Sequence, residues 1–348
     1  MRAFSKIPML VALSFVLSMG CGGSSDDGPA GSGGSGGTAG LGGSAGDGGA
    51  GGSRFLQLTA WGSHSCGLSE DGSVECWGSD AHASVDPPVG ETFEEIQTAN
   101  TYSCGVRTNR TVACWGEGQG TAVPTGELFE TVALGVNHAC GLRADGTVRC
   151  WGGVTDDEEC ANKKYSCGQG ASPDGTFTQI AAGHYSNCGL RPEGTIYCWG
   201  AGRTDDSVAP NFGQGLAPAG SYDRLFAGVW HYCALSASGE LSCWGAGTKQ
   251  GCSGGDNLHC GQAIPPDGEF KALGLGWLHS CGVRSDNSTV CWGIDQGGSG
   301  DLDPPAGEVF DQLTAGQYHS CGLRADGVGI CWGFVPCGGP GEDPCGTQ

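Results

Sequence analysis

The sequence predicts an all-β protein, a seven-bladed β-propeller with a cross-strand disulfide in each blade. The first observation behind this prediction is a pair of cysteines ten positions apart, the second of which is followed by Trp-Gly. The second is that this unit occurs seven times, with first cysteines 36 to 48 residues apart, a spacing typical of propeller blades. The pairs are Cys66-Cys76, Cys104-Cys114, Cys140-Cys150, Cys188-Cys198, Cys233-Cys243, Cys281-Cys291 and Cys321-Cys331. Seven copies of one unit predict a single closed ring.

The residues between the paired cysteines predict a β-hairpin in each repeat. In the third repeat a tight turn at Gly146 separates two short apolar runs, and glycine suits the turn because it accepts a positive φ. A three-residue loop there places Leu142 opposite Val148. The same register places Cys140 opposite Cys150, at a site where facing Cα atoms approach to about 4.5 Å. A disulfide accepts that separation, so each pair is expected to form a cross-strand bond.

The turn position is not glycine in every repeat. Five repeats have glycine there, whereas the second repeat has Arg110 and the sixth has Asn287. Asparagine tolerates a left-handed backbone, but arginine does so less readily. We therefore expect mild backbone strain at Arg110.

Six further cysteines form three close pairs in loops and in the C-terminal tail. They are Cys160-Cys167, Cys252-Cys260 and Cys337-Cys345. We expect these pairs to be disulfides as well, which would leave only Cys21 of the 21 cysteines without a partner. So many predicted disulfides indicate a protein that leaves the cytoplasm.

Cys21 follows a short apolar segment at the N-terminus. Residues 7–17 are mainly apolar, come after Arg2 and Lys6, and lead into Leu-Ser-Met-Gly-Cys. This order resembles a bacterial lipoprotein signal peptide with its lipobox, although serine replaces the usual aliphatic residue. The segment is too short to span a bilayer and is typical of a processed leader. We expect residues 1–20 to be removed and Cys21 to carry a lipid; ordinary secretion with an unpaired Cys21 is the alternative.

The chain is expected to have three parts. After the leader at 1–20, residues 21–53 form a tether that begins with the lipidated Cys21, and half of residues 22–53 are glycine, so no core can form there. Residues 54–348 form one propeller domain, because the repeats adjoin with only loop-length insertions.

The strong negative charge of the chain argues against nucleic-acid binding. The net charge is −21, and it becomes −23 without the leader, with 14 basic against 37 acidic residues. Such a surface repels phosphate backbones, and no basic patch offsets it.

The repeat also resembles a known family. The last copy has Ala315-Gly316, His319-Ser320, Asp326-Gly327 and Trp332-Gly333. These residues resemble the regulator of chromosome condensation repeat family, whose members are seven-bladed propellers. This chain differs in its hairpin cysteines and in lacking the usual Gly-Gln-Leu-Gly after Trp-Gly. The resemblance implies a rigid platform for protein contacts, but the family's nucleotide exchange and chromatin binding are not expected of an exported, acidic protein.

One rim of the predicted propeller is the candidate binding surface. If each blade is an antiparallel meander, the turns before the first cysteines and the loops after Trp-Gly share this rim, including both loops with extra cysteines. Its aromatic residues gather in repeats four to seven. They are His184, Tyr185, Trp230, Trp277 and Tyr318. Exposed aromatics on rigid turns are typical of binding hot spots. The alternative is that they pack under neighbouring loops.

Histidine occurs two positions before the first cysteine in five repeats. The five are His64, His138, His231, His279 and His319. Because neighbouring blades carry one each, we expect structural hydrogen bonds and no metal site. The repeated Trp is expected to pack between blades. The acidic run with Asp156, Asp157 and Glu159 is interpreted as a solvated loop, with calcium binding as the alternative.

Together these patterns predict a non-enzymatic, lipid-anchored protein of the cell envelope, with the outer membrane favoured. It would bind an envelope or extracellular protein or glycan, without cofactor or metal; the sequence identifies neither the partner nor the oligomeric state. No nucleophile elbow, paired carboxylates in a known motif or phosphate loop is present. Two rival hypotheses are a tethered inhibitor of a secreted hydrolase and an enzyme whose site is built from rim loops.

Overall fold

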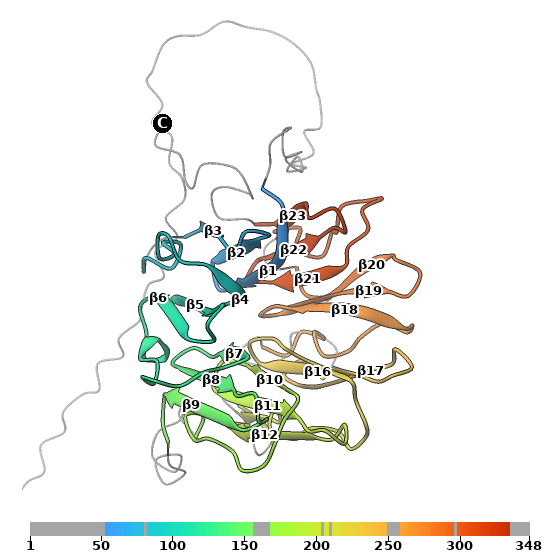
Figure 1. Cartoon of the computed structure of the whole chain (residues 1–348). Coiled ribbons are helices and arrows are strands. Elements are labelled where there is room, and N and C mark those ends of the chain that lie inside the picture. The colour runs from blue at the N-terminus through green and yellow to red at the C-terminus, as the bar shows by residue number, and fades with distance from the viewer. Residues whose placement is uncertain are drawn as a thin grey trace, which may run out of the picture. The chain divides into compact units, whose positions relative to one another are not determined.

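The computed structural model describes residues 53–79, 82–155, 168–202, 205–208, 211–248, 258–295 and 298–334. In these ranges it contains seven three-stranded sheets and one two-stranded sheet (Figure 1). All paired strands are antiparallel, and each three-stranded sheet is formed by consecutive strands of one repeat. Within the described ranges, no helix is long and apolar enough to cross a membrane.

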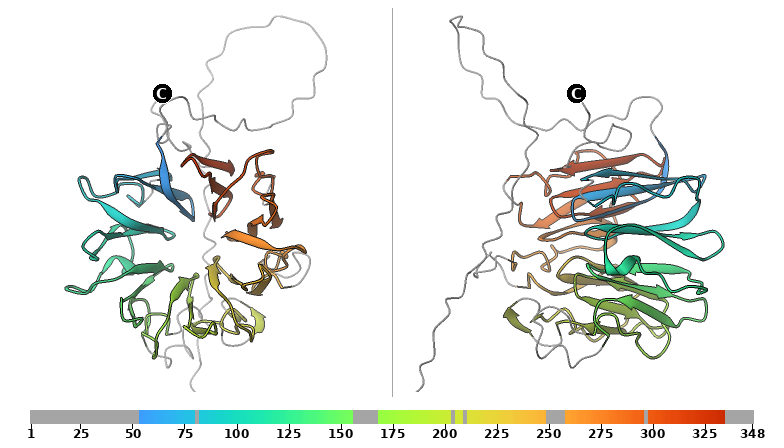
Figure 2. Two further views of the ribbon diagram at one scale, coloured as in Figure 1. Left: turned by 45° about the vertical axis from the view of Figure 1, so that its right-hand side comes forward. Right: turned by 90° about the vertical axis from the view of Figure 1, so that its left-hand side faces the viewer.

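The seven sheets are the blades of a ring around a central axis (Figure 2). From blade 1 to blade 7 the strands are β1 Phe55–Trp61, β2 His64–Ser69, β3 Val74–Gly78; β4 Phe93–Thr98, β5 Tyr102–Arg107, β6 Val112–Gly116; β7 Thr131–Leu134, β8 His138–Leu142, β9 Val148–Gly152; β10 Gln179–Ala182, β11 Ser186–Leu190, β12 Ile196–Gly200; β15 Arg224–Ala227, β16 His231–Leu235, β17 Leu241–Gly245; β18 Phe270–Leu275, β19 His279–Arg284, β20 Thr289–Gly293; and β21 Gln312–Ala315, β22 His319–Leu323, β23 Gly329–Gly333. The loops between blades add the short helix η1 Gln119–Thr121 and the pair β13 Asp205–Val208 and β14 Asn211–Phe212. The predicted fold class is thus confirmed.

The register of the hairpins is the one the sequence predicts. Cys140 faces Cys150 and Leu142 faces Val148 between β8 and β9. All seven predicted hairpin disulfides are present, each with a Cα–Cα separation of 4.0 Å. Each blade is therefore closed covalently between its second and third strands.

The turns have the expected backbone. Arg110 and Asn287 adopt φ values of 66° and 71°, beside the glycines at equivalent turns. In the third repeat the Asp145 carboxylate accepts hydrogen bonds from the backbone N–H and the hydroxyl of Thr147, at 2.9 and 2.6 Å. This local bond stabilises the turn and explains why aspartate precedes the turn glycine.

The aromatic residue at the start of each repeat and the Trp of Cys-Trp-Gly form the core of the blades. Phe270 is 2% exposed and lies 5.8 Å from Trp292, and both pack against Leu235 of the preceding blade. The inter-blade packing predicted for the tryptophans is confirmed. The glycine after the first cysteine makes room for this ring: a Cβ on Gly282 would lie 2.6 Å from Phe270 Cδ1. Only the fifth repeat has alanine at this position, at Ala234.

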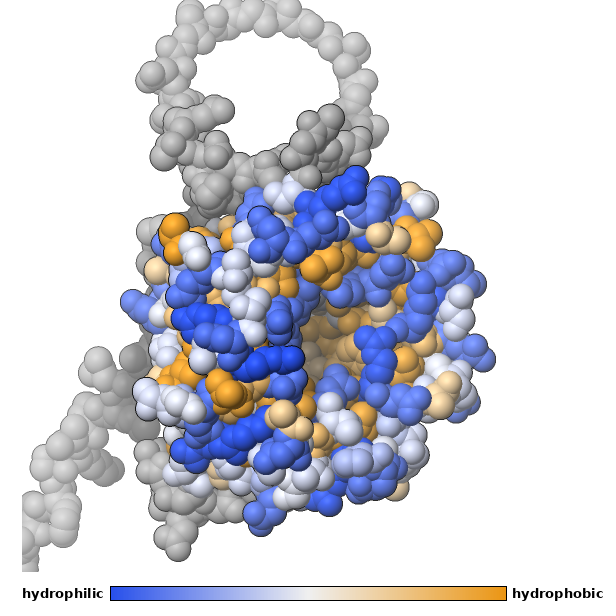
Figure 3. Space-filling model, viewed as in Figure 1, coloured by the Kyte–Doolittle hydropathy of each residue, from blue (hydrophilic) through white to orange (hydrophobic). Residues whose placement is uncertain are grey.

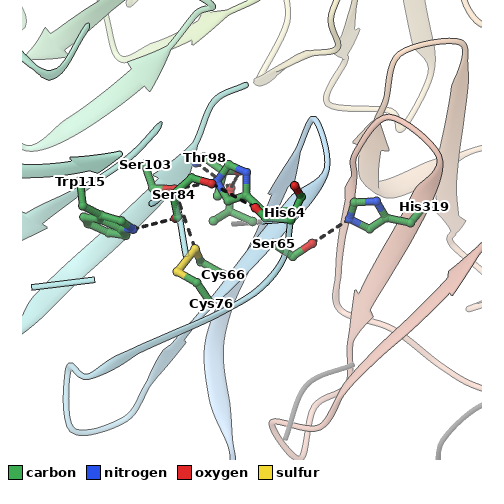
Figure 4. The surroundings of a disulfide bond; sticks show 11 residues. His64, Ser65, Cys66, Cys76, Ser84, Thr98, Ser103, Trp115 and His319 are labelled. Carbon is green, nitrogen blue, oxygen red and sulfur yellow. Dashed lines mark hydrogen bonds between the residues drawn. A yellow bond between two sulfur atoms is a disulfide. The ribbon is translucent and has the colours of Figure 1, made fainter. Parts of the chain in front are cut away.

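Among the described strands, none is exchanged between the first and last blades. The Phe55 N–H donates to Gly327 O at 2.8 Å, as the Phe177 N–H does to Gly146 O between blades 3 and 4. The hydroxyl of Ser65 bonds His319 Nε2 at 2.7 Å across the same joint (Figure 4). Blade 7 therefore meets blade 1 through the contacts that join other neighbours.

The Gly-Gln segment that seemed to be missing lies further along the loops. Gln169, Gln214 and Gln262 each follow a glycine and are 1% exposed or less. The backbone carbonyl of Gln214 accepts a hydrogen bond from Trp244 Nε1 at 2.9 Å. These glutamines thus bury the loop after Trp-Gly against the tryptophan of the next blade.

Several predicted features lie outside the described residues. They are Cys21, Cys160, Cys167, Cys252, Cys337 and Cys345, together with Asp156, Asp157 and Glu159. Cys260 is described and is disulfide-bonded. The leader, the tether, the three additional cysteine pairings and the domain boundaries remain predictions.

Candidate binding rim

The histidines that recur in five of the repeats join neighbouring blades. The Nε2 atom of each histidine forms a hydrogen bond with the side chain of the residue that precedes the first cysteine of the next blade. The pairs are His64 with Ser103, His138 with Asn187, His231 with Ser280, His279 with Ser320 and His319 with Ser65, at 2.7 to 2.9 Å. Figure 4 shows two of these bonds on either side of blade 1. The predicted structural hydrogen bonds are therefore confirmed.

Two joints lack histidine and use tyrosine instead. Tyr102 stands where other blades have histidine, and its hydroxyl donates to backbone carbonyls of blade 3, because Ala139 offers no side-chain acceptor. At the joint of blades 4 and 5, Ser186 is short, and Tyr232 of the next blade reaches back to it at 2.9 Å. The replacement of histidine by tyrosine at these joints was not predicted. The residues that directly precede the first cysteines, Ala139 and Tyr232, are the sequence signal that could have indicated it.

Burial keeps these histidines neutral. Desolvation lowers the pKa of His231 and of His64 to about 3 and that of His138 to about 4. Neutral imidazole is a good hydrogen-bond partner for a hydroxyl and a poor site for charge. Among the described residues, no group of three or more His, Cys, Asp or Glu side chains is arranged to hold a metal ion.

One joint has the arrangement of a Ser-His-Asp triad. Ser320 bonds His279 Nε2 at 2.9 Å, and Asp301 Oδ2 lies 3.3 Å from His279 Nδ1. Burial and the nearby Asp295 raise the pKa of Asp301 to about 7. Ser320 and His279 are 0% exposed and Asp301 is 1% exposed, so substrate from solvent does not reach the hydroxyl. The cluster is a blade joint in which aspartate takes the place of the buried loop glutamine.

The candidate rim is the one formed by the turns between the first and second strands of each blade, named here the histidine rim. The turns are tied to each other by backbone bonds: the His184 N–H donates to Val229 O and the Gln317 N–H to Gly62 O, both at 2.8 Å. The opposite rim, with the Asp-Gly turns, is named the hairpin rim. The backbone bonds make the histidine rim a rigid frame for its side chains.

The five predicted aromatic residues come together on this rim, but they are not equally exposed. Trp230 is only 7% exposed and lies 4.6 Å from His184 and 5.8 Å from Tyr185, between ring centroids. The expectation that Trp230 is an exposed anchor is therefore wrong. Trp230 packs against His184 and Tyr185, in agreement with the alternative hypothesis that the rim aromatics are buried. His184 is partly buried as well, and desolvation lowers its pKa to about 3.

The remaining aromatics form a partly exposed surface that we name the aromatic patch, consisting of Tyr185, Trp277 and Tyr318. Trp277 packs against the buried cluster of Phe212, Trp230 and Ala246, and its ring lies 6.2 Å from that of Tyr318. The buried cluster therefore holds the patch from below, and it links blades 4 to 7.

Sequence reasoning missed the residues beneath the patch. Phe212 comes from the insertion after blade 4 and is 2% exposed, 5.5 Å from Trp230 and 5.2 Å from His259. Trp61 of blade 1 lies 5.9 Å from His184 of blade 4. Nothing in the repeat pattern predicts these pairs, because they join insertions and blades that are distant in sequence.

Charge is distributed unequally between the two rims. All Lys and Arg side chains among the described residues lie at the hairpin rim or within two residues of it. They are Arg54, Arg107, Arg110, Arg143, Arg149, Arg191, Arg224, Lys271, Arg284 and Arg324. The described part of the histidine rim carries acidic Glu117 and Asp295. The described part of this rim is therefore aromatic and acidic.

Comparison with known proteins agrees with this architecture. Residues 129–154 and 177–204 match the sequence profile of the regulator of chromosome condensation (RCC1) repeat. Repeats three and four thus match this repeat family, which confirms the resemblance seen in the sequence. No curated protein sequence matched the chain.

Solved structures share the fold. The CRINKLY WD40 ectodomain of the receptor kinase ACR4 from Arabidopsis thaliana is 24% identical, with a TM-score of 0.61, covering 84% of this chain and 99% of that one. The ectodomain of the receptor kinase CR4 from Physcomitrella patens is 24% identical, with a TM-score of 0.59, covering 80% and 74%. Prp20p from Saccharomyces cerevisiae, described by its binding to Gsp1p and histones, is 16% identical, with a TM-score of 0.56, covering 82% and 83%. At these identities the likeness defines the fold alone.

Proposed function

We propose that this protein is a non-enzymatic, lipid-anchored protein of the cell envelope that uses the aromatic patch to bind a partner protein. The observation that carries the proposal is the partial exposure of Tyr185, Trp277 and Tyr318 above a buried aromatic cluster. Large aromatic side chains that are already held in place lose little conformational entropy on binding, which is why they dominate interface energies.

The charge of the described part of the histidine rim favours a partner with basic residues around an apolar centre. Trp277 and Tyr318 are partly exposed aromatic residues, and Glu117 and Asp295 place carboxylates on the same rim. Lys and Arg side chains interact with both kinds of group. The solved relative Prp20p, which is described as binding proteins, supports the use of this fold as a platform.

Capture from an envelope extract tests the patch. The full chain is compared with a Trp277→Ala/Tyr318→Ala variant, and Tyr197→Ala is the matched control, since Tyr197 is 43% exposed on β12 and outside the patch. We expect the double variant to lose the partner and the control to retain it. Because Trp277 packs against the buried cluster, the melting temperature of each variant is measured to confirm that the protein is folded at the temperature of the assay. Equal capture by all three proteins would refute the patch, and capture of a glycan in place of a protein would refute the partner class.

The anchor is tested separately. Cells that express the full chain are labelled with a fatty-acid analogue and fractionated, and the Cys21→Ala variant is the control. We expect lipid on the wild-type protein in the membrane fraction and neither lipid nor membrane association in the variant. A soluble, unlabelled wild-type protein would contradict the anchor and leave the patch experiment unaffected.

A further inference from the structure

A cavity of about 370 Å³ lies on the axis of the ring, lined by the first strand of every blade. The surface is hollowed at the centre of the ring (Figure 3). The cavity is large enough for a small ligand. Two of the residues that line it, Trp61 and Glu95, differ from the residues at the equivalent positions of other repeats.

Trp61 lies at the histidine-rim end of the cavity. Five repeats have glycine at this position and the second has Ala99; the glycines are Gly135, Gly183, Gly228, Gly276 and Gly316. Trp61 belongs to blade 1, but its ring lies 5.9 Å from His184 of blade 4, on the other side of the seven-membered ring. The indole therefore crosses the axis, and it gives this end of the cavity an aromatic wall.

Glu95 lies on the wall of the cavity, at a position where three blades have glutamine. Gln57 shows what the position does for the fold: its amide donates to Ile96 O at 2.8 Å and accepts from the Ile96 N–H at 3.0 Å, which joins blade 1 to blade 2. Gln179 joins blade 4 to blade 5 in the same way. A carboxylate has no donor for the second bond, so glutamate is a poorer residue than glutamine for this structural role.

The carboxylate of Glu95 has hydrogen-bond donors but no countercharge. It accepts from Gln97 Nε2 at 3.0 Å, from the Thr131 hydroxyl at 2.7 Å and from the backbone N–H of Val132. None of the described Lys or Arg side chains forms an ion pair with it. Desolvation raises its pKa to about 6, so at neutral pH it is a charged group that a bound cation would stabilise.

The other charged groups of the cavity are engaged elsewhere. Arg224 lies with its guanidinium carbon 4.9 Å from the centroid of Phe226 and donates to Lys271 O at 2.6 Å. Asp311 has Lys271 Nζ at 3.9 Å. Glu95 is thus the carboxylate of the lining that lacks a cationic neighbour, and Trp61 supplies an aromatic surface in the same space.

We propose that the axial cavity binds a small organic cation, with its ammonium group on Glu95 and its apolar part toward Trp61. The Glu95 carboxylate supplies the charge that the cation needs, and the Trp61 indole closes the histidine-rim end of the cavity with an apolar surface. The cavity and the aromatic patch are different surfaces, so this proposal does not depend on the proposed protein partner.

The test measures binding of butylammonium chloride to the full chain by NMR titration. Glu95→Gln restores the residue of the other blades and removes the charge, so we expect the fold to be retained and affinity to fall about tenfold or more, the effect of losing one charge-assisted contact. Glu94→Gln is the matched control: this neighbouring carboxylate is exposed, does not line the cavity and pairs with Arg110.

Equal affinity in the wild type, Glu95→Gln and Glu94→Gln would show nonspecific attraction to an acidic protein and would overturn the proposal. Glucose and sodium butyrate are titrated in parallel. Saturable binding of either one, without binding of butylammonium, would show that the cavity selects a neutral or anionic ligand and would equally refute the assignment. The melting temperature of each variant confirms that the protein measured is folded.

Discussion

Replacing Gly282 by alanine tests the packing that holds each blade together. The added Cβ would lie 2.6 and 2.7 Å from Phe270 Cδ1 and Cε1, and 3.1 Å from Leu273 Cδ2. Phe270 cannot move freely, because it is 2% exposed and packed against Trp292. The ring must shift by roughly 0.8 Å to reach ordinary contact distance, and overpacking of this kind costs about 1 to 3 kcal/mol.

The expected result is a less stable protein with an unchanged fold. A loss of about 1 to 3 kcal/mol corresponds to a fall in Tm of roughly 2 to 12 °C for a domain of this size. Thermal unfolding followed by circular dichroism measures the fall, with the disulfides intact. Ala234→Gly in blade 5 is the reverse control: here a Cβ is already accommodated, and its removal should cost about 0.5 to 1 kcal/mol through backbone freedom.

A double variant shows whether the cause is the aromatic ring. Phe270→Leu alone leaves a void and is destabilising, but in the Gly282→Ala background it also removes the overlap. The two changes together should therefore cost less than the sum of the single variants. Additive losses, or a Gly282→Ala protein as stable as the wild type, would refute the role assigned to this glycine.

Three further predictions concern the joints and the disulfides. Tyr102→His should destabilise the joint of blades 2 and 3 by about 2 to 4 kcal/mol, through a void and two lost hydrogen bonds. Adding Ala139→Ser should recover about 1 kcal/mol, because it recreates the His-Ser hydrogen bond of other joints. Urea unfolding of the wild type, the two single variants and the double variant measures the coupling energy between the two positions, and a coupling energy of zero would contradict this prediction. His231 has a pKa lowered by burial, to about 3, so its contribution to stability is complete above the unfolded pKa of about 6.5 and is lost as pH falls through the window from 6.5 to 3. We expect His231→Gln to be less stable at pH 7 and to lose less stability between pH 6.5 and pH 5, by up to about 1.4 kcal/mol per pH unit; an unchanged slope would show that the residue is not buried as a neutral group. Removing both Cys140 and Cys150 as alanines should cost roughly 3 kcal/mol, since a closed loop of about ten residues no longer restricts the unfolded chain; a loss below 1 kcal/mol in denaturant unfolding would indicate that the hairpin is already ordered without the bond.

Local sequence signals predicted the blade because its chemistry is local. The hairpin around Gly146 fixes the pairing of Cys140 with Cys150, since a three-residue turn leaves one register in which both apolar faces agree. The positive φ at Arg110 followed from its place in the repeat. Seven copies of such a unit then define the ring.

The binding surface was only partly predictable. The repeat located the five aromatic residues on one rim, but the burial of Trp230 depends on Phe212, which comes from an insertion with no counterpart in other repeats. Periodicity carries no information about such a segment. Whether a rim aromatic is exposed and can contact a partner, or is buried and supports its neighbours, depends on how the folded loops cover it.

The amino-acid sequence by itself determined the number of blades, their strand register and their disulfides, because each depends on residues within about ten positions of each other. The tertiary structure alone decided how Tyr102 compensates for Ala139, that Trp61 reaches His184 across the axis, and that Glu95 lacks a countercharge. These features arise where different blades meet, and the distances between residues of different blades are set by the closure of the ring.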